Sequence, residues 1–247
     1  MISLIEVLRI WLKMDNKVYA MDELFKQSPV LEHTFDKETQ VLTIDNYYEN
    51  PEAIYEWLCN RQYPLWKYNP ERQTMNGVNY NDCRIADKVA HPTRIYFAEM
   101  ERLLNICRLY FHRGEYNWDM IQEFNIFQTI GVYDTKVQHY PHIDSELSTP
   151  DETSTLNFLV YLDKEESGGT AVYGGEWITN DESHNLLYPV EERFTIEHII
   201  PAKFNRAVVF PGNRLHGAYI DDYTKYSGDK WRFSQVQFFH PQRGNRR

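Results

Sequence analysis

The chain has 247 residues, a formal net charge of −10 and an aromatic content of 15%. Acidic surfaces repel phosphate groups, so the charge argues against a duplex nucleic acid or an anionic membrane as partner. A hydrophobic content of 42% is enough for a core, and the 18 Tyr and 13 Phe residues favour strands over helices.

The first predicted element is a helix over residues 1–28. Its opening run is apolar, but it is too short to cross a bilayer, and Glu6 and Arg9 interrupt it. It has neither the basic start nor the small-residue cleavage site of a signal peptide. We therefore expect no membrane-spanning segment, and a helix that can dock two copies of the chain as a homodimer.

A strand and a second helix follow. The strand covers residues 41–44. Asn50 and Pro51 then place an Asn at the N-cap and a Pro in the first turn, which predicts a helix from Pro51 to about Arg61.

The next segment, residues 63–88, is polar and interrupted by proline and glycine, which predicts a long loop. Loops of this length within a compact domain are usually lids or binding loops. Pro92 then begins another helix, which we expect to end near Arg113.

From residue 124 onward the pattern changes to short β-rich runs separated by turn residues. The predicted strands are 124–130, 137–143, 156–162, 171–173, 207–210 and 233–239. Many short strands with turn signals indicate a sandwich or barrel. The polar run 176–197 is expected to be an insertion beside the barrel mouth.

These elements predict a mainly β fold with N-terminal α-helices and a jelly-roll core. We expect one domain over residues 1–247, in which residues 1–123 supply helical support and a lid and residues 124–240 form the core. Three widely spaced cysteines without a Cys-x-x-Cys pair indicate neither a disulfide framework nor a zinc ribbon. They favour reduced thiols and a cytoplasmic location.

The tripeptide His142-Ile143-Asp144, together with the distant His216, is the pattern that points to chemistry. On a strand, the period of two places His142 and Asp144 on one side and Ile143 on the other. His216 would complete two imidazoles and one carboxylate, which is the ligand set of non-haem iron and leaves open positions on the metal. Structural zinc prefers four closed ligands, often thiolates, and no cysteine accompanies these residues. His139 would face the opposite side of a straight strand, so we expect it to be structural.

A second pattern, Arg232-Phe233-Ser234, places a guanidinium fork and a hydroxyl on one face of a strand. That pair suits a carboxylate, although a surface salt bridge is the alternative for Arg232. Asn157 and Tyr140 are further candidates for binding the same acid, against plain packing or a structural hydrogen bond.

Taken in order over residues 124–240, these landmarks resemble the Fe(II)- and 2-oxoglutarate-dependent dioxygenases, whose fold is a double-stranded β-helix. The landmarks are Tyr140-Pro141-His142-Ile143-Asp144, residues 156–163 with Gly168-Gly169-Thr170, Val208-Val209-Phe210-Pro211 leading to Leu215-His216-Gly217, and Arg232-Phe233-Ser234. A weaker likeness of residues 41–53 is to the opening of bacterial and phage-type members. His216 and Arg232 lie 16 positions apart (232 − 216), longer than is common in the family, and a polar loop over residues 219–230 accounts for the excess.

The resemblance implies that His142, Asp144 and His216 bind Fe(II) and are the catalytic residues. It implies that 2-oxoglutarate and O₂ fill the open positions, with Arg232 and Ser234 on the distal carboxylate of the co-substrate. Decarboxylation to succinate and CO₂ would accompany hydroxylation of the substrate, because Asp144 fills the position that related halogenases vacate.

The substrate side rests on the predicted loop, where Trp66, Tyr80 and Arg84 are candidates for contact. Arg84 can bind a substrate carboxylate or simply lie on the surface. Stacking sites for nucleic acid come with basic grooves, which this acidic chain does not favour. A small molecule such as an amino acid, or a peptidyl side chain, is therefore the expected substrate. Two other classes stay open: a catalytically silent jelly-roll module for binding or assembly, and a cupin-like metalloenzyme that does not use 2-oxoglutarate.

Overall fold

The computed structural model describes residues 21–60, 83–90, 96–111, 118–129, 141–144, 155–175, 194–226 and 230–241. Within these ranges the strands are β1 (His33–Asp36), β2 (Val41–Ile44), β3 (Cys83–Ala90), β4 (Trp118–Thr129), β5 (Leu156–Tyr161), β6 (Gly169–Gly175), β7 (Phe194–Pro201), β8 (Arg206–Pro211), β9 (His216–Tyr219) and β10 (Arg232–Pro241). The helices are α2 (Met21–Leu24), α3 (Pro51–Cys59) and α4 (Tyr96–Phe111), with a 3-10 helix, η3 (Tyr223–Tyr226).

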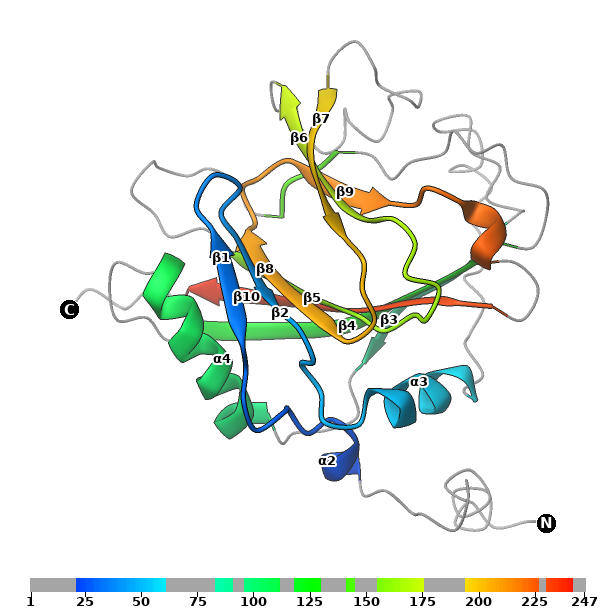
Figure 1. Cartoon of the computed structure of the whole chain (residues 1–247), viewed down its shortest axis with the longest axis horizontal. Helices are drawn as coiled ribbons and strands as arrows, with labels where there is room; N and C mark the ends of the chain where they lie inside the picture. Colours follow the sequence, from blue (N-terminus) through cyan, green and yellow to red (C-terminus); the bar gives the residue numbers. More distant parts are fainter. Residues whose placement is uncertain are drawn as a thin grey trace.

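The strands form two sheets (Figure 1). One has seven strands in the order β1-β2-β8-β5-β10-β4-β3, and the other has three in the order β7-β6-β9. Each of these neighbouring pairs is antiparallel. The prediction of a mainly β chain is confirmed, and the two sheets are consistent with a jelly-roll fold. Among the described residues no helix is long and apolar enough to cross a membrane.

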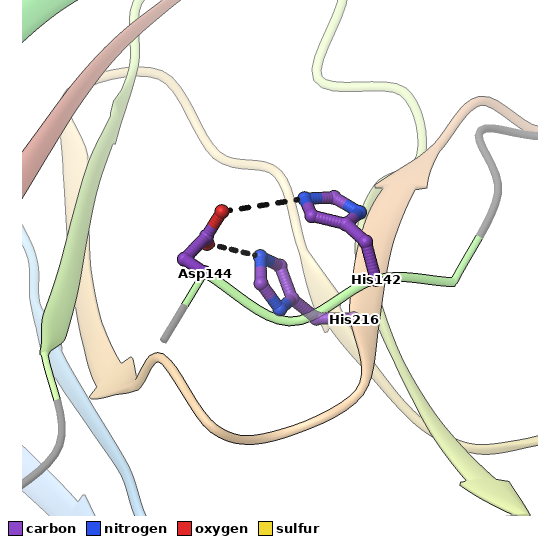
Figure 2. A group of neighbouring side chains, drawn as sticks. All are labelled: His142, Asp144 and His216. Carbon is purple, nitrogen blue, oxygen red and sulfur yellow. Dashed lines mark ion pairs between the residues drawn. The ribbon is translucent and has the colours of Figure 1, made fainter. Parts of the chain in front are cut away.

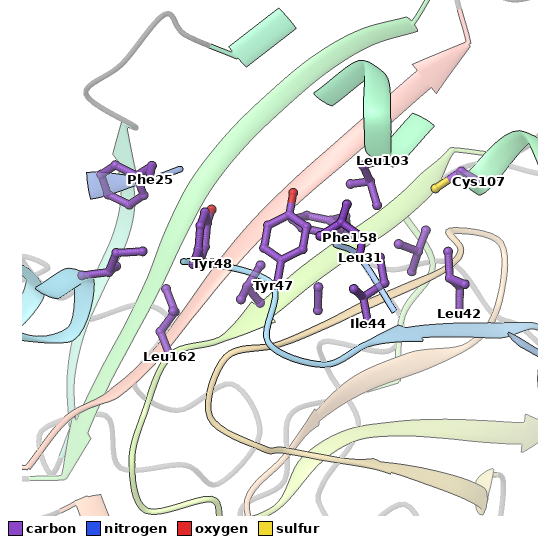
Figure 3. Packing of buried hydrophobic residues seen from close by; sticks show 14 of the residues in the cluster. Phe25, Leu31, Leu42, Ile44, Tyr47, Tyr48, Leu103, Cys107, Phe158 and Leu162 are labelled. Atoms are coloured by element: carbon purple, nitrogen blue, oxygen red, sulfur yellow. The ribbon is translucent and has the colours of Figure 1, made fainter. Parts of the chain in front are cut away.

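The seven-stranded sheet has a large apolar core on one face. Alternate residues of a strand point to opposite faces, and Phe158 and Val160 of β5 both belong to this core. Buried residues of α3 and α4 join them, among them Leu58 and Leu103, so the two helices cover this face (Figure 3). We call it the helix face.

The opposite face of β5 is turned toward the three-stranded sheet. Tyr161 of β5 and Phe210 of β8 pack there with Val172 and Ile200 from β6 and β7. Because side chains alternate along a strand, Asn157 lies on the same side as Tyr161. This side, called the inner face below, is the one that carries the polar residues of interest.

Helix α3 begins as the sequence predicts, with Pro51 in its first turn. Ile54 and Leu58, one helical turn apart, are buried against the helix face. Asn50 occupies the N-cap position but its side chain makes no capping hydrogen bond; the carbonyl of Asn50 accepts from the amide of Ile54 at 3.3 Å.

The helix predicted over residues 1–28 is wrong at its end, and residues 1–20 lie outside the described residues. The helix stops at Leu24, and Gln27 pairs with Tyr48 in an isolated β-bridge. The amide of Ser28 then donates to the carbonyl of Tyr47 at 2.8 Å. Pairing with a segment twenty positions away therefore replaces the helical hydrogen bonds that local pattern suggested.

The long loop predicted over residues 63–88 is also wrong at its end. From Cys83 onward the chain forms β3, which pairs with β4 along the edge of the larger sheet. Strand β4 itself begins at Trp118, earlier than residue 124, and β3 pairs with its residues 123–129. Backbone hydrogen bonds to a long neighbour can hold a polar strand that local propensity does not indicate. Residues 61–82 lie outside the described ranges.

Two further expectations need correction. Residues 194–197, placed in an insertion by their polarity, belong to β7, whose partner is β6; residues 176–193 lie outside the description. The predicted loop 219–230 contains regular structure in its described part, because Tyr219 ends β9 and η3 follows.

Candidate metal centre

Three side chains converge at one end of the inner face (Figure 2). His142 Nε2 lies 3.7 Å from Asp144 Oδ1, and His216 Nε2 lies 3.0 Å from Asp144 Oδ2. One ligand atom from each of the three residues falls within 4.8 Å of the other two. Two imidazole nitrogens and a carboxylate oxygen therefore surround a single point, as a metal ion requires.

Backbone pairing brings the two histidines together from distant parts of the chain. The amide of His142 donates to the carbonyl of His216 at 2.9 Å, and the reverse bond is 3.0 Å. The amide of Asp144 donates to the carbonyl of Gly212 at 2.8 Å. The strand predicted over residues 137–143 is thus reduced, in its described part, to an isolated bridge at His142. His142 and Asp144 still share a side, as the period of two predicted.

The ring of His216 is held by a backbone carbonyl. Its Nδ1 lies 2.8 Å from the carbonyl oxygen of Arg214. A carbonyl oxygen only accepts, so Nδ1 carries a hydrogen and Nε2 is the ring nitrogen that faces Asp144. This is the arrangement that orients metal-binding histidines in general. The role of Arg214 could not be predicted from the sequence, because a backbone carbonyl leaves no signal in a pattern of side chains.

The carboxyl group of Asp144 is in its ionised form at neutral pH. Burial raises its pKa, but the hydrogen bond with His216, the charges of His216 and His142 and the hydrogen bond from Asn157 together hold the pKa below its usual value. An ionised carboxylate is the form that binds a metal.

Asn157 supports the same three residues. Its Nδ2 donates to Asp144 Oδ2 and lies 3.2 Å from His216 Nε2. Its Oδ1 is buried and finds no hydrogen-bond partner among the described residues. Asn157 was predicted to contact the co-substrate; the contacts in the structure are with metal-site residues.

Arg232 and Ser234 lie toward the other end of the inner face. In the pairing of β10 with β5, Ser234 is opposite Tyr161 and Phe238 is opposite Asn157. Directly paired residues share a face, and four positions of strand span about 13 Å. Arg232 and Ser234 therefore lie on the same face of the sheet as Asn157, roughly one strand length away from it.

Arg232 is only 5% exposed, which does not fit the alternative of a surface salt bridge. Its Nη2 donates to the carbonyl of Gly169 at 3.3 Å, and its Nε finds no partner in the described part of the chain. Ser234 is 2% exposed. A buried guanidinium with most of its donors unused can bind an anion.

The remaining predicted residues are not brought into the site by the described structure. Tyr140, Trp66 and Tyr80 lie outside the described residues. Arg84 lies on β3, where it is paired with Gln128 of β4.

No protein-family model and no curated protein matches the sequence. Among solved structures, the chain is similar to HygX from Streptomyces hygroscopicus with nickel, 2-oxoglutarate and hygromycin B bound, at 14% identity and a TM-score of 0.46 over 83% of this chain and 84% of HygX. It is similar to SnoN, a non-heme α-ketoglutarate-dependent epimerase from nogalamycin biosynthesis, at 15% identity and a TM-score of 0.44 over 81% and 77% of the two chains. A structure of prolyl 4-hydroxylases from Phytophthora capsici is similar at 12% identity and a TM-score of 0.39 over 89% and 71%. HygX is described with 2-oxoglutarate bound, and SnoN is described in complex with α-ketoglutarate.

Proposed function

We propose that the chain is an Fe(II)- and 2-oxoglutarate-dependent dioxygenase that hydroxylates an amino acid, another small metabolite or a peptidyl side chain and releases succinate and CO₂. The observation that carries this proposal is the convergence of His142, Asp144 and His216 on one point. Two imidazoles and one carboxylate leave positions for a bidentate acid and O₂.

The donor set fits Fe(II). Asp144 is ionised, which is the form that binds a metal, and Nε2 of His216 is the ring nitrogen that faces it. His142, Asp144 and His216 would hold the ion, and Asn157 would keep the carboxylate of Asp144 in place. Once bound, Fe(II) and 2-oxoglutarate supply the oxidising chemistry with O₂.

The opposite end of the inner face fits the distal carboxylate of 2-oxoglutarate. The guanidinium of Arg232 is buried, and its Nε has no partner among the described residues. Ser234, two positions along β10, adds a hydroxyl on the same face. We assign these two residues to the co-substrate, with Tyr140 and Asn157 as further candidates and Trp66, Tyr80 and Arg84 as candidates for the substrate.

The proposal takes the two sheets as a double-stranded β-helix and residues 1–247 as one domain. Its support is that β1, β2 and β3 from the first half of the chain lie in one sheet with β4, β5, β8 and β10. Residues 1–123 would supply helical support and a lid to the core over residues 124–240.

The test is an anaerobic titration of the metal-free protein with Fe(II) and then with 2-oxoglutarate, followed by the visible charge-transfer band of the chelate. We expect the band in the wild-type protein and in His33→Ala, a control that removes a histidine outside the site. We expect no band in His142→Ala or Asp144→Ala.

Other outcomes would favour the other classes of function. Iron binding with no band and no succinate across a broad substrate panel would favour the silent binding module. Activity that Arg232→Ala leaves unchanged would favour the cupin-like metalloenzyme, since that enzyme needs no cation for a co-substrate.

A further inference from the structure

The segment between β9 and β10 contacts the turn between β5 and β6 at two points. At one point the hydroxyl of Ser167 donates to Asp221 Oδ1. At another, Lys230 Nζ forms an ion pair with Glu165 Oε1 at 2.8 Å. The residues that lengthen the chain between His216 and Arg232 are therefore held by contacts on both sides of η3. The contact of Lys230 lies next to the start of β10 and Arg232.

Between these two contacts lies a buried polar pair, Asp163 and Tyr226. Asp163 is 1% exposed and Tyr226 is fully buried. The hydroxyl of Tyr226 lies 3.2 Å from Asp163 Oδ1 and 3.1 Å from the carbonyl oxygen of Ser167. Asp163 Oδ2 is buried and finds no partner among the described residues.

Asp163 accepts from the backbone amides of Glu166 and Glu165, and the hydroxyl of Tyr226 shares one hydrogen between two oxygen atoms. The carbonyl oxygen of Ser167 can only accept, and the hydroxyl of Tyr226 has one hydrogen to give. If that hydrogen goes to Ser167, the contact with Asp163 needs a second hydrogen, and only Asp163 can supply it. Both contacts are satisfied when Asp163 is a carboxylic acid.

Burial favours the same state. An ionised carboxylate with one oxygen unpaired in the interior is costly, and such groups tend to become neutral. Burial raises the pKa of Asp163. The positive charge of Arg232, the hydrogen bond from Tyr226 and the backbone hydrogen bonds from Glu166 and Glu165 oppose this rise but do not reverse it.

The state of Asp163 decides how much of the charge of Arg232 is available. Arg232 donates to the carbonyl of Gly169 and forms no ion pair with Asp163 among the described contacts. Its charge nevertheless lowers the pKa of Asp163. An ionised Asp163 would compete for this cation with any carboxylate on the inner face. A protonated Asp163 leaves the full positive charge of Arg232 available to that carboxylate.

We propose that Asp163 is a neutral carboxylic acid held by Tyr226, and that its neutrality reserves the guanidinium of Arg232 for the distal carboxylate of the co-substrate. This inference rests on the function proposed above. Asp163 is a positioning residue, because it acts through Arg232.

The titratable groups that face Asp163 come from four elements. They are Arg232 on β10, Tyr226 on η3, Tyr161 on β5 and Tyr55 on α3. Burial raises the pKa of Tyr161 and of Tyr55 to about 12, and it raises the pKa of Tyr226 as well. The tyrosines therefore stay neutral near pH 7, and Arg232 is the charge that Asp163 controls.

The first arm of the test is infrared spectroscopy of the metal-free full chain. We expect a carboxylic-acid C=O band at neutral pH that is absent from Asp163→Asn. Tyr226→Phe should move this band to higher frequency, because the acid loses its hydrogen-bond partner; this variant serves if Asp163→Asn does not fold. A wild-type spectrum without the band overturns the proposal.

The second arm is calorimetric binding of 2-oxoglutarate to Mn(II)-loaded protein between pH 6 and 9. In the wild type the Kd should rise with pH, by up to about tenfold per pH unit once Asp163 ionises. In Asp163→Asn, which stays neutral, this rise should be absent. Glu165→Gln is the matched control: it removes the same charge from the same turn at an exposed ion pair and should behave as wild type.

Equal pH slopes in the wild type and Asp163→Asn overturn the proposal even if the band is present. If the wild-type protein binds no 2-oxoglutarate at any pH, the proposed function fails, and the role of Asp163 in co-substrate binding fails with it. The infrared arm still reports the proton in that case, so the two failures are distinguishable.

Discussion

The two ends of the inner face of β5 differ in how far they are open to solvent. At the metal end, the side chains of His142 and Asp144 are 27% and 19% exposed, on a short bridge and the bend after it. At the other end, Arg232 is 5% exposed on a regular strand, and Tyr226, whose pKa the charge of Arg232 lowers, is fully buried.

The difference in exposure is consistent with what each end would bind in the proposed function. A metal centre needs access for ligands that come and go, so open coordination positions must reach solvent. A lone cation recognises a carboxylate best where water is excluded, because charge interactions strengthen as the effective dielectric constant falls. An open end and a closed end of the inner face therefore fit the proposed function, in which an acid enters by the metal and its far carboxylate binds Arg232.

Removing a metal ligand should have the largest effect. In Asp144→Ala we expect iron affinity to fall by more than about 100-fold, since even residues that only support a ligand contribute up to that much. Succinate formation should be lost with the thermal transition retained. Full turnover in both Asp144→Ala and His142→Ala would break the assignment of the open end.

Removing the cation should affect the closed end alone. In Arg232→Ala the Kd for 2-oxoglutarate should rise by at least about 30-fold, which corresponds to about 2 kcal/mol for a lost buried charge contact. Iron binding should match the wild type, because Arg232 does not contact His142, Asp144 or His216 in the structure. A matching loss of iron affinity would show that the two ends are not separate.

The sequence predicted the residues of the metal end better than their backbone. Period two placed His142 and Asp144 on one side, and their order with His216 completed the set. Of the strand predicted over residues 137–143, the described residues 141–143 contain only the bridge that joins His142 to His216, a segment far away in the sequence. Local propensity does not encode such a contact.

The closed end was predicted only in part, for the same physical reason. Arg232 and Ser234 were found because they sit two positions apart on one strand. Asp163 and Tyr226 lie 63 positions apart, and their contact exists only after β5 and η3 are brought together. The polar segment that carries Tyr226 has the composition of a loop, so nothing in it signals a buried hydroxyl.

The fold shows a similar division. The strands β2, β5, β8 and β10 have apolar residues on both faces of the sheet, and all four were predicted. The strands β7 and β9 carry exposed or small residues, as in Glu197 and Gly217, and were missed. Their pairing with β6 supplies what their own sequences do not.

A smaller effect is expected from the support of the metal ligands. Asn157→Ala removes the donor to Asp144 Oδ2, and we expect metal affinity to fall by about 10–100-fold with 2-oxoglutarate affinity on the metal-loaded protein little changed. Isothermal titration with Mn(II) measures the first quantity. If instead the co-substrate affinity falls and metal affinity stays, Asn157 contacts 2-oxoglutarate as the sequence suggested.

The smallest effect is expected from a change at Asp45, and it tests whether the two ends of the inner face depend on residues outside that face. Asp45 follows β2 and accepts from Arg206 Nε at 2.7 Å and from Lys203 Nζ at 2.9 Å. The hydrogen bond from Arg206, opposed by burial and helped by Lys203, lowers the pKa of Asp45 to about 2. A lowered pKa stabilises the fold above the unfolded value and loses that contribution as pH falls from about 4 to about 2.

In Asp45→Asn we therefore expect the free energy of unfolding at pH 7 to fall by about 1 kcal/mol, after allowance for solvent screening of a partly exposed pair. Urea denaturation should show the wild type and Asp45→Asn converging below pH 2. Glu49→Gln, which removes the exposed ion pair with Lys26, is the control and should change stability by less than about 0.5 kcal/mol. Neither change should alter the affinity for metal or for 2-oxoglutarate, because Asp45 and Glu49 contact neither end of the inner face in the described structure. A change in either affinity would mean that Asp45 or Glu49, and not the inner face alone, sets the geometry of the site.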